Sequence, residues 1–158
     1  MKKLLIALFT LTLFVSCTSS TPDDILPPPK DYTAQNEKEI TDYLAKNNLT
    51  ATRTSTGLYY IIKTEGTGKQ PSALSNVTVK YKGYFTSGKV FDQSKEPPLA
   101  FSLSKVIQGW KEGIPFFKEG GSGVLLIPSH LGYGSYDDTR GIPAGSVLIF
   151  DIELISVN

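Results

Sequence analysis

The stretch Val106–Ile114, which reads Val-Ile-Gln-Gly-Trp-Lys-Glu-Gly-Ile, contains the only tryptophan of the chain. Val106, Ile107 and Trp110 stand at positions i, i+1 and i+4, so a short helix places these three apolar side chains on one side. Each of the two glycines weakens an isolated helix by about 1 kcal/mol relative to alanine, so the helix must be held by residues that pack on it. We therefore expect the fold to be built around Trp110.

The sequence on both sides of this stretch supplies large aromatic residues that could surround the tryptophan. They are Tyr81, Phe91, Phe101, Tyr133 and Phe150. Aromatic side chains grouped around one tryptophan are typical of an ordinary core and also of the apolar walls of a ligand pocket. The residues alone leave both interpretations open.

Apolar residues recur at every second position before and after Trp110, which is the pattern of half-buried strands. The clearest alternations are Val77-Val79-Tyr81, Leu99-Phe101-Leu103 and Leu148-Phe150-Ile152-Leu154. Shorter runs at 58–63, 89–92 and 124–127 indicate further strands, separated by turns that contain glycine or proline. The sequence therefore predicts an α+β domain over residues 57–158, in which an antiparallel sheet of five or six strands wraps around one short helix.

The composition excludes several classes of function. The 158 residues include 16 basic and 15 acidic side chains without a long run of either sign, so no nucleic-acid-binding surface is expected. The single cysteine rules out an intrachain disulfide and a zinc site built from thiolates. The single histidine, His130, fits no metal-ligand spacing, and no serine is marked as its nucleophilic partner. We expect neither a metal nor a cofactor.

Residues 1–16 have the pattern of an export signal, with two lysines followed by an apolar run that is too short to span a bilayer. The run ends in Leu-Phe-Val-Ser-Cys, which resembles a bacterial lipobox and implies that Cys17 is lipidated and anchors the protein to a membrane. Ordinary signal cleavage, which leaves an unmodified thiol, is the alternative. Residues 17–34 are rich in Ser, Thr, Pro and Asp, and we expect them to form a flexible tether.

Residues 35–56 are expected to form an N-terminal helix and a linker. Asn36 and Glu39 have the spacing of a capping box, and the helix carries Ile40, Tyr43 and Leu44 on one face. A stripe this narrow could dock on the following domain, pair with a second copy or remain half solvated. Docking is favoured, which predicts a monomer.

Several short motifs occur in a characteristic order in the C-terminal two thirds of the chain. They are Tyr81-Lys82-Gly83-Tyr84, Gly88-Lys89-Val90-Phe91-Asp92-Gln93-Ser94, Val106-Ile107-Gln108-Gly109-Trp110, Tyr133-Gly134, Gly141-Ile142-Pro143 and Leu148-Ile149-Phe150-Asp151. With these motifs at this spacing, residues 57–158 resemble an FKBP-type peptidyl-prolyl cis-trans isomerase. The signal, the lipobox and the short helix ahead of the domain are similar to those of exported bacterial lipoproteins of that family.

The resemblance implies a pocket with Trp110 as its floor. The implied catalytic residues are Tyr81, Phe91, Asp92, Ile107, Trp110, Tyr133 and Phe150, and the implied substrate-binding residues are Leu99, Phe101, Val106 and Ile142. The implied activity is isomerisation of Xaa-Pro bonds in exported proteins, in the bacterial cell envelope, on the periplasmic side or at the outer membrane. The macrolides that inhibit the family are implied ligands. A polypeptide-binding chaperone that uses the same pocket without turnover is the alternative function.

Two features at the rim of the implied pocket depart from the family pattern. Leu99 stands where many members have an aromatic residue, and the loop after Tyr133 carries the charged residues Asp137, Asp138 and Arg140. We expect both departures to affect substrate preference and to leave the floor of the pocket unchanged.

Overall fold

The computed structural model describes residues 28–138 and 141–158. The predicted signal peptide, Cys17 and the tether up to residue 27 lie outside the described residues, as does Arg140. Within the described ranges, no helix is both long enough and apolar enough to cross a bilayer.

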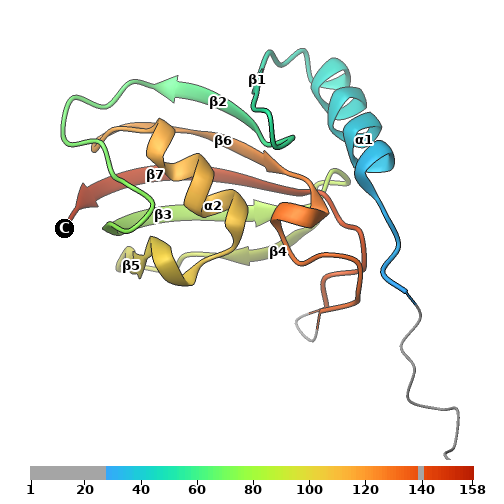
Figure 1. Ribbon diagram of the computed structural model, residues 1–158. Helices are drawn as coiled ribbons and strands as arrows, with labels where there is room; N and C mark the ends of the chain where they lie inside the picture. The colour runs from blue at the N-terminus through green and yellow to red at the C-terminus, as the bar shows by residue number, and fades with distance from the viewer. Residues whose placement is uncertain (1–27, 139–140) are drawn as a thin grey trace, which may run out of the picture.

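Seven strands form one antiparallel sheet in the described part of the chain (Figure 1). They are β1 Thr52–Arg53, β2 Tyr59–Thr64, β3 Asn76–Tyr84, β4 Val90–Gln93, β5 Leu99–Ser102, β6 Ser122–Ile127 and β7 Leu148–Val157. The order across the sheet is β1-β2-β6-β7-β3-β4, and β5 also pairs with β3. The predicted α+β class and antiparallel sheet are confirmed. The strand beyond the expected six is β1, whose two residues are too few to show an alternation.

The last strand, β7, lies between β6 and β3 near the middle of the sheet. Leu148, Phe150, Ile152 and Leu154 point to one face and are all buried, as their alternation predicts. Ile149, which points to the other face, is also fully buried. Both faces of β7 are therefore covered, each by a different helix.

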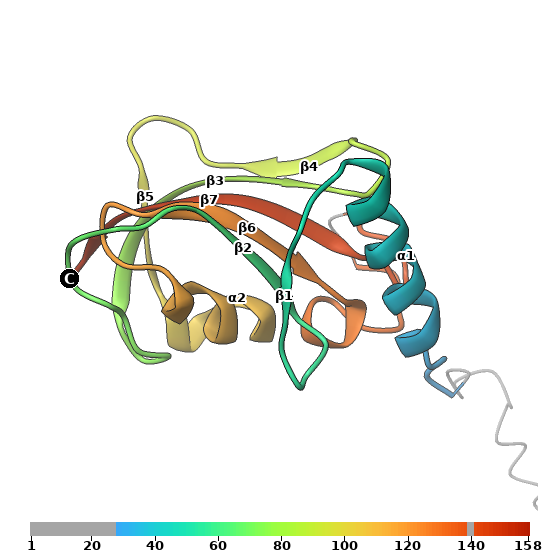
Figure 2. The same cartoon turned by 90° about the horizontal axis from the view of Figure 1, so that it is seen from above.

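The helix α2, Gln108–Gly113, covers the first face (Figures 1 and 2). A Cβ atom on Gly109 would lie 2.5 Å from Cγ2 of Ile127, and one on Gly113 would lie 2.6 Å from Cδ1 of Leu125. Because such contacts are too short for real side chains, only glycine lets the helix approach β6 this closely. The glycines that weaken the isolated helix are thus what allows the sheet to hold it.

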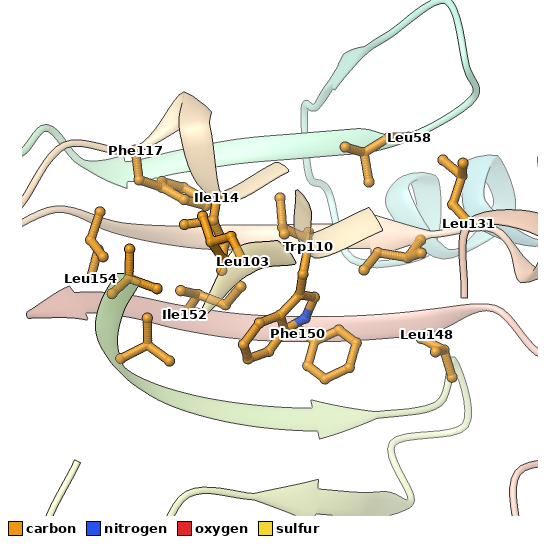
Figure 3. Packing of buried hydrophobic residues seen from close by; sticks show 14 of the residues in the cluster. Leu58, Leu103, Trp110, Ile114, Phe117, Leu131, Leu148, Phe150, Ile152 and Leu154 are labelled. Carbon is orange, nitrogen blue, oxygen red and sulfur yellow. The ribbon is translucent and has the colours of Figure 1, made fainter. Parts of the chain in front are cut away.

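The predicted packing around the tryptophan is confirmed. Trp110 is 4% exposed and lies in a cluster of buried side chains from the sheet and from the segments next to α2 (Figure 3). The short 3-10 turns of the described chain are η2 Leu103–Lys105, η3 Ile114–Phe116 and η4 Ser129–Leu131.

The helix α1, Thr33–Lys46, covers the second face of the sheet. Its residues Ile40 and Leu44 pack in a second cluster with Leu126 of β6 and Ile149 of β7. Ile40 is fully buried and Leu44 is 9% exposed, so the apolar stripe is covered by the domain of its own chain. The expected docking of this helix is confirmed.

The predicted capping box is wrong. The helix begins three residues earlier than Asn36, at Thr33, and its N-cap residue is Tyr32, which makes no side-chain capping bond. Asn36 lies inside the helix and is fully buried, with its hydrogen bonds made to a distant loop. Glu39 instead accepts a hydrogen bond from the hydroxyl of Thr86, in the turn between β3 and β4.

Candidate active site

A cavity of about 450 Å³ opens on the face of the sheet that α2 covers. Its lining comes from β3, β4, β5, η2, β7, the start of α2 and the loop after η4. The lining residues are Tyr81, Asp92, Phe101, Lys105, Val106, Ile107, Trp110, Tyr133 and Phe150. Segments distant in sequence therefore meet at one hollow that combines aromatic and polar side chains.

Three aromatic rings surround Trp110 nearly at right angles to it. Tyr81, Phe101 and Phe150 have ring centroids 5.1, 5.6 and 5.3 Å from that of Trp110, with interplanar angles of 84°, 84° and 82°. Edge-to-face pairs of this kind match the positive edge of one ring with the negative face of another. The Trp110 indole N–H is buried and has no hydrogen-bond partner within the described residues. Trp110 and the three rings around it thus form an aromatic box.

The polar groups of the cavity are few and come from different elements. The Tyr81 hydroxyl donates a hydrogen bond of 2.8 Å to Oδ2 of Asp92. Burial, and then this bond to Asp92, raises the pKa of the Tyr81 phenol well above its usual value. Tyr81 therefore stays protonated and keeps Asp92 in place. The backbone of Tyr81 is held by Ser94, whose hydroxyl accepts from the Tyr81 N–H at 3.0 Å.

The structure brings eight of the eleven residues predicted for the pocket into its lining. Phe91 lies behind the lining, edge-on to Phe150 with ring centroids 5.5 Å apart. Ile142 is 4% exposed and belongs to the core. Leu99 is 40% exposed and pairs with Val79 at the start of β5, outside the lining.

Sequence reasoning missed Lys105, which lines the cavity from the end of η2. It directly precedes Val106, so its position just before that motif was the one available signal. A lysine next to an apolar run is usually solvated, which is why the pattern did not single it out.

The described residues contain no group of three or more His, Cys, Asp or Glu side chains that could hold a metal ion. The described side chains around the cavity offer hydrogen bonds and aromatic faces. Such a site can bind an apolar ring and orient the polar groups next to it.

The comparisons with known proteins agree with this geometry. A family model described as FKBP-type peptidyl-prolyl cis-trans isomerase matches residues 67–155. The FKBP-type peptidyl-prolyl cis-trans isomerase FkpA of Escherichia coli K12 is 43% identical over 122 residues, which are 76% of this chain and 44% of that protein. FkpA of Buchnera aphidicola from Acyrthosiphon pisum is 44% identical over 107 residues, which are 66% of this chain and 44% of that protein.

Solved structures give the same result. The crystal structure of Escherichia coli FkpA has a TM-score of 0.71 and 40% identity, over 80% of this chain and 61% of that one. A peptidyl-prolyl cis-trans isomerase from Pseudomonas syringae has a TM-score of 0.69 and 32% identity, over 82% of this chain and 98% of that one. This chain spans less than half the length of the curated relatives described above. On the match over residues 67–155, the chain belongs to the family of FKBP-type peptidyl-prolyl cis-trans isomerases.

Proposed function

We propose that this protein catalyses the cis-trans isomerisation of Xaa-Pro bonds in exported polypeptides. The observation that carries the proposal is the cavity of about 450 Å³, in which three rings stand edge-on around Trp110. A prolyl ring is apolar and compact, and it fits a floor of this kind. The flanking peptide carbonyls then face the polar groups of the rim.

The chemistry needs no covalent step. Rotation about the amide is opposed by a resonance barrier of about 18–20 kcal/mol, which makes the uncatalysed reaction take about tens to hundreds of seconds. The planar amide is charge-separated and well solvated, whereas the twisted transition state is less dipolar. An apolar box therefore favours the twisted form over the planar one. Each 1.36 kcal/mol by which the box lowers the activation free energy makes the isomerisation about tenfold faster.

Each polar group then has a role in holding the peptide. The Ile107 N–H and the Tyr133 hydroxyl bind substrate carbonyls, and the prolyl ring rests on Trp110. Asp92 orients its neighbours, a role supported by the 2.8 Å bond that it accepts from Tyr81. Leu99 and Ile142 lie outside the lining. The exposed Leu99 affects the binding of longer substrates, and the buried Ile142 affects the packing behind the cavity wall. The macrolides that inhibit the family compete for the same cavity.

A peptide assay tests the activity directly. Peptides that differ in the residue before proline are followed during cis-trans exchange, with and without the protein. We expect acceleration that is lost when a macrolide is added. If the folded protein accelerates no peptide but binds unfolded chains in competition with the macrolide, the chaperone function replaces the catalytic one.

The place of action is the cell envelope, with the protein anchored through lipid on Cys17. The lipobox-like end of the apolar run supports this. Acyl chains contribute about 0.8 kcal/mol per buried CH2, and more than one chain gives stable anchoring. The intact mass of the protein isolated from membranes should show cleavage before Cys17 and added acyl groups. A cleaved protein without acyl mass contradicts the anchor, and Cys17→Ser should leave the protein uncleaved or release it from the membrane.

A further inference from the structure

Asn36 of α1 makes an unusual contact with the loop that carries Tyr133. Its side chain is fully buried. The oxygen and the nitrogen of its amide group each form a hydrogen bond with the backbone of the segment between β6 and β7. The Ser129 N–H donates to Oδ1 of Asn36 at 2.8 Å. Nδ2 of Asn36 donates to the Gly145 carbonyl, also at 2.8 Å. One side chain therefore ties together two residues near the beginning and the end of that segment.

These two bonds complete a closed ring of hydrogen bonds. The Gly134 N–H donates to the Ser129 carbonyl at 2.8 Å, and the Gly145 N–H donates to the Gly134 carbonyl at 3.0 Å. The circuit thus runs from Asn36 through Ser129, Gly134 and Gly145 back to Asn36. Gly134 directly follows Tyr133, which lines the cavity. The ring therefore fixes the peptide group next to a cavity residue.

The chain just before Asn36 holds the same loop by two more contacts. The Ser135 hydroxyl donates to the Lys30 carbonyl at 2.6 Å. The ring of Tyr32 lies against Gly145, where an added Cβ would be 2.3 Å from Cδ1 of the tyrosine. Figures 1 and 2 show α1 beside the segment that follows β6. The start of α1 and the residues before it thus form a support for the loop.

Asparagine suits this position for a chemical reason. Its amide carries an acceptor and a donor on one short, rigid group, so it can satisfy an N–H and a C=O at the same time. Both backbone groups would otherwise be buried without a partner, which folded proteins avoid. The docking of α1 on the sheet does not require a buried Asn36, because Ile40 and Leu44 already supply the apolar contact between the helix and the sheet.

We propose that Asn36 is a positioning residue for Tyr133, and that α1 acts on the cavity through it. The effect on catalysis rests on the proposed function, whereas the effect on the loop does not. With the ring intact, the loop holds the Tyr133 side chain at the cavity. Without Asn36 the loop opens between Ser129 and Gly145, and the hydroxyl of Tyr133 spends less time in reach of the substrate.

The test compares Asn36→Ala with Leu44→Ala in the full-length protein. Both changes remove a buried side chain of α1, but Leu44 packs on the sheet and has no part in the ring. Under conditions in which all variants are folded, Asn36→Ala should lower kcat/KM by about threefold to tenfold, the range for one neutral hydrogen bond. Leu44→Ala should leave kcat/KM within about twofold of the parent.

A double mutant separates positioning from a general loss of structure. In a Tyr133→Phe background, the further loss caused by Asn36→Ala should shrink to less than about twofold, because the hydroxyl that it positions is already absent. Equal losses in both backgrounds overturn the proposal. If the parent is active and Asn36→Ala has the same kcat/KM as the parent, the proposal is overturned as well.

A second variant and a second measurement keep the test decisive. If Asn36→Ala does not fold, Asn36→Asp keeps the acceptor for Ser129 and regains a donor for Gly145 when its carboxyl is protonated, so its kcat/KM relative to the parent should rise as the pH is lowered. If the parent shows no turnover, the proposed function fails, and amide hydrogen exchange of Gly134 and Gly145 then decides. The Gly134 and Gly145 amides should exchange faster in Asn36→Ala, or in Asn36→Asp at neutral pH, than in Leu44→Ala. Equal exchange rates overturn the proposal that Asn36 holds the loop.

Discussion

Replacing Phe150 by alanine removes one wall of the cavity. The side chain is 4% exposed and makes ring contacts with Trp110, Phe91 and Tyr81 at 5.3, 5.5 and 6.2 Å. Truncating a buried phenylalanine typically costs about 3–5 kcal/mol, because the cavity that remains adds to the lost burial. The free energy of unfolding should fall by that amount.

The neighbouring residue provides a matched control. Ile149 lies on the same strand, is fully buried and points to the opposite face, under α1. Ile149→Ala should cost about 2–5 kcal/mol of stability, which overlaps the range for Phe150→Ala. Only Phe150 borders the cavity, so only Phe150→Ala admits water to the site of reaction. We expect its kcat/KM to fall at least about tenfold, or about 1.4 kcal/mol.

The assay has two parts. Urea unfolding followed by circular dichroism gives the stability of each variant, and the proline-peptide assay is then run at a temperature at which both are fully folded. Comparable losses of stability with unequal losses of activity are the expected outcome. If Ile149→Ala loses as much activity as Phe150→Ala at equal folded fraction, the aromatic box is not what lowers the barrier.

Three further predictions concern the polar groups and the helix. Tyr133→Phe should lower kcat/KM by about threefold to tenfold through one lost hydrogen bond, and an unchanged rate in the peptide assay removes its hydroxyl from the mechanism. Because burial and Asp92 raise the pKa of Tyr81 above 10.0, its contribution to stability is full below that pH and is lost as the pH rises above it. Above pH 10, the free energy of unfolding measured in urea should therefore fall less steeply with rising pH for Tyr81→Phe than for the parent. Equal slopes contradict this role of Tyr81. A chain that begins at Thr18 should sediment as a monomer, and a dimer that dissociates when Ile40 and Leu44 are changed to serine would contradict the docking of α1 as its main role.

Patterns local in sequence predicted most of the sheet. The alternation in β7 identified a strand, because side chains of period two must face one core. Trp110 and the two apolar residues before it predicted a short helix. That helix, α2, begins only at Gln108, so Val106 and Ile107 precede it with non-helical backbone and line the cavity from outside the helix. The two-residue strand β1 carries no such pattern, since it is defined by its pairing with Tyr59 and Tyr60. A strand this short can be identified only once the position of the strand that it pairs with is known.

The candidate site was less predictable where long-range contacts decide it. Asn36 has the local spacing of a capping residue, but its partners lie 93 and 109 positions away. The family resemblance implied Ile142 and Leu99 as pocket residues, yet Ile142 is buried in the core and Leu99 is exposed to solvent. Lys105 faces the cavity because η2 ends there. None of these orientations follows from spacing along the chain.

The single tryptophan has a practical consequence. Because Trp110 is the only indole of the chain and borders the cavity, all indole fluorescence of the protein originates at the site of binding. Its N–H is buried without a partner within the described residues, so a ligand group that reaches it should shift the emission. The protein thus carries its own optical reporter. Affinities for peptides and macrolides can be measured without a label, and independently of whether any bond is turned over.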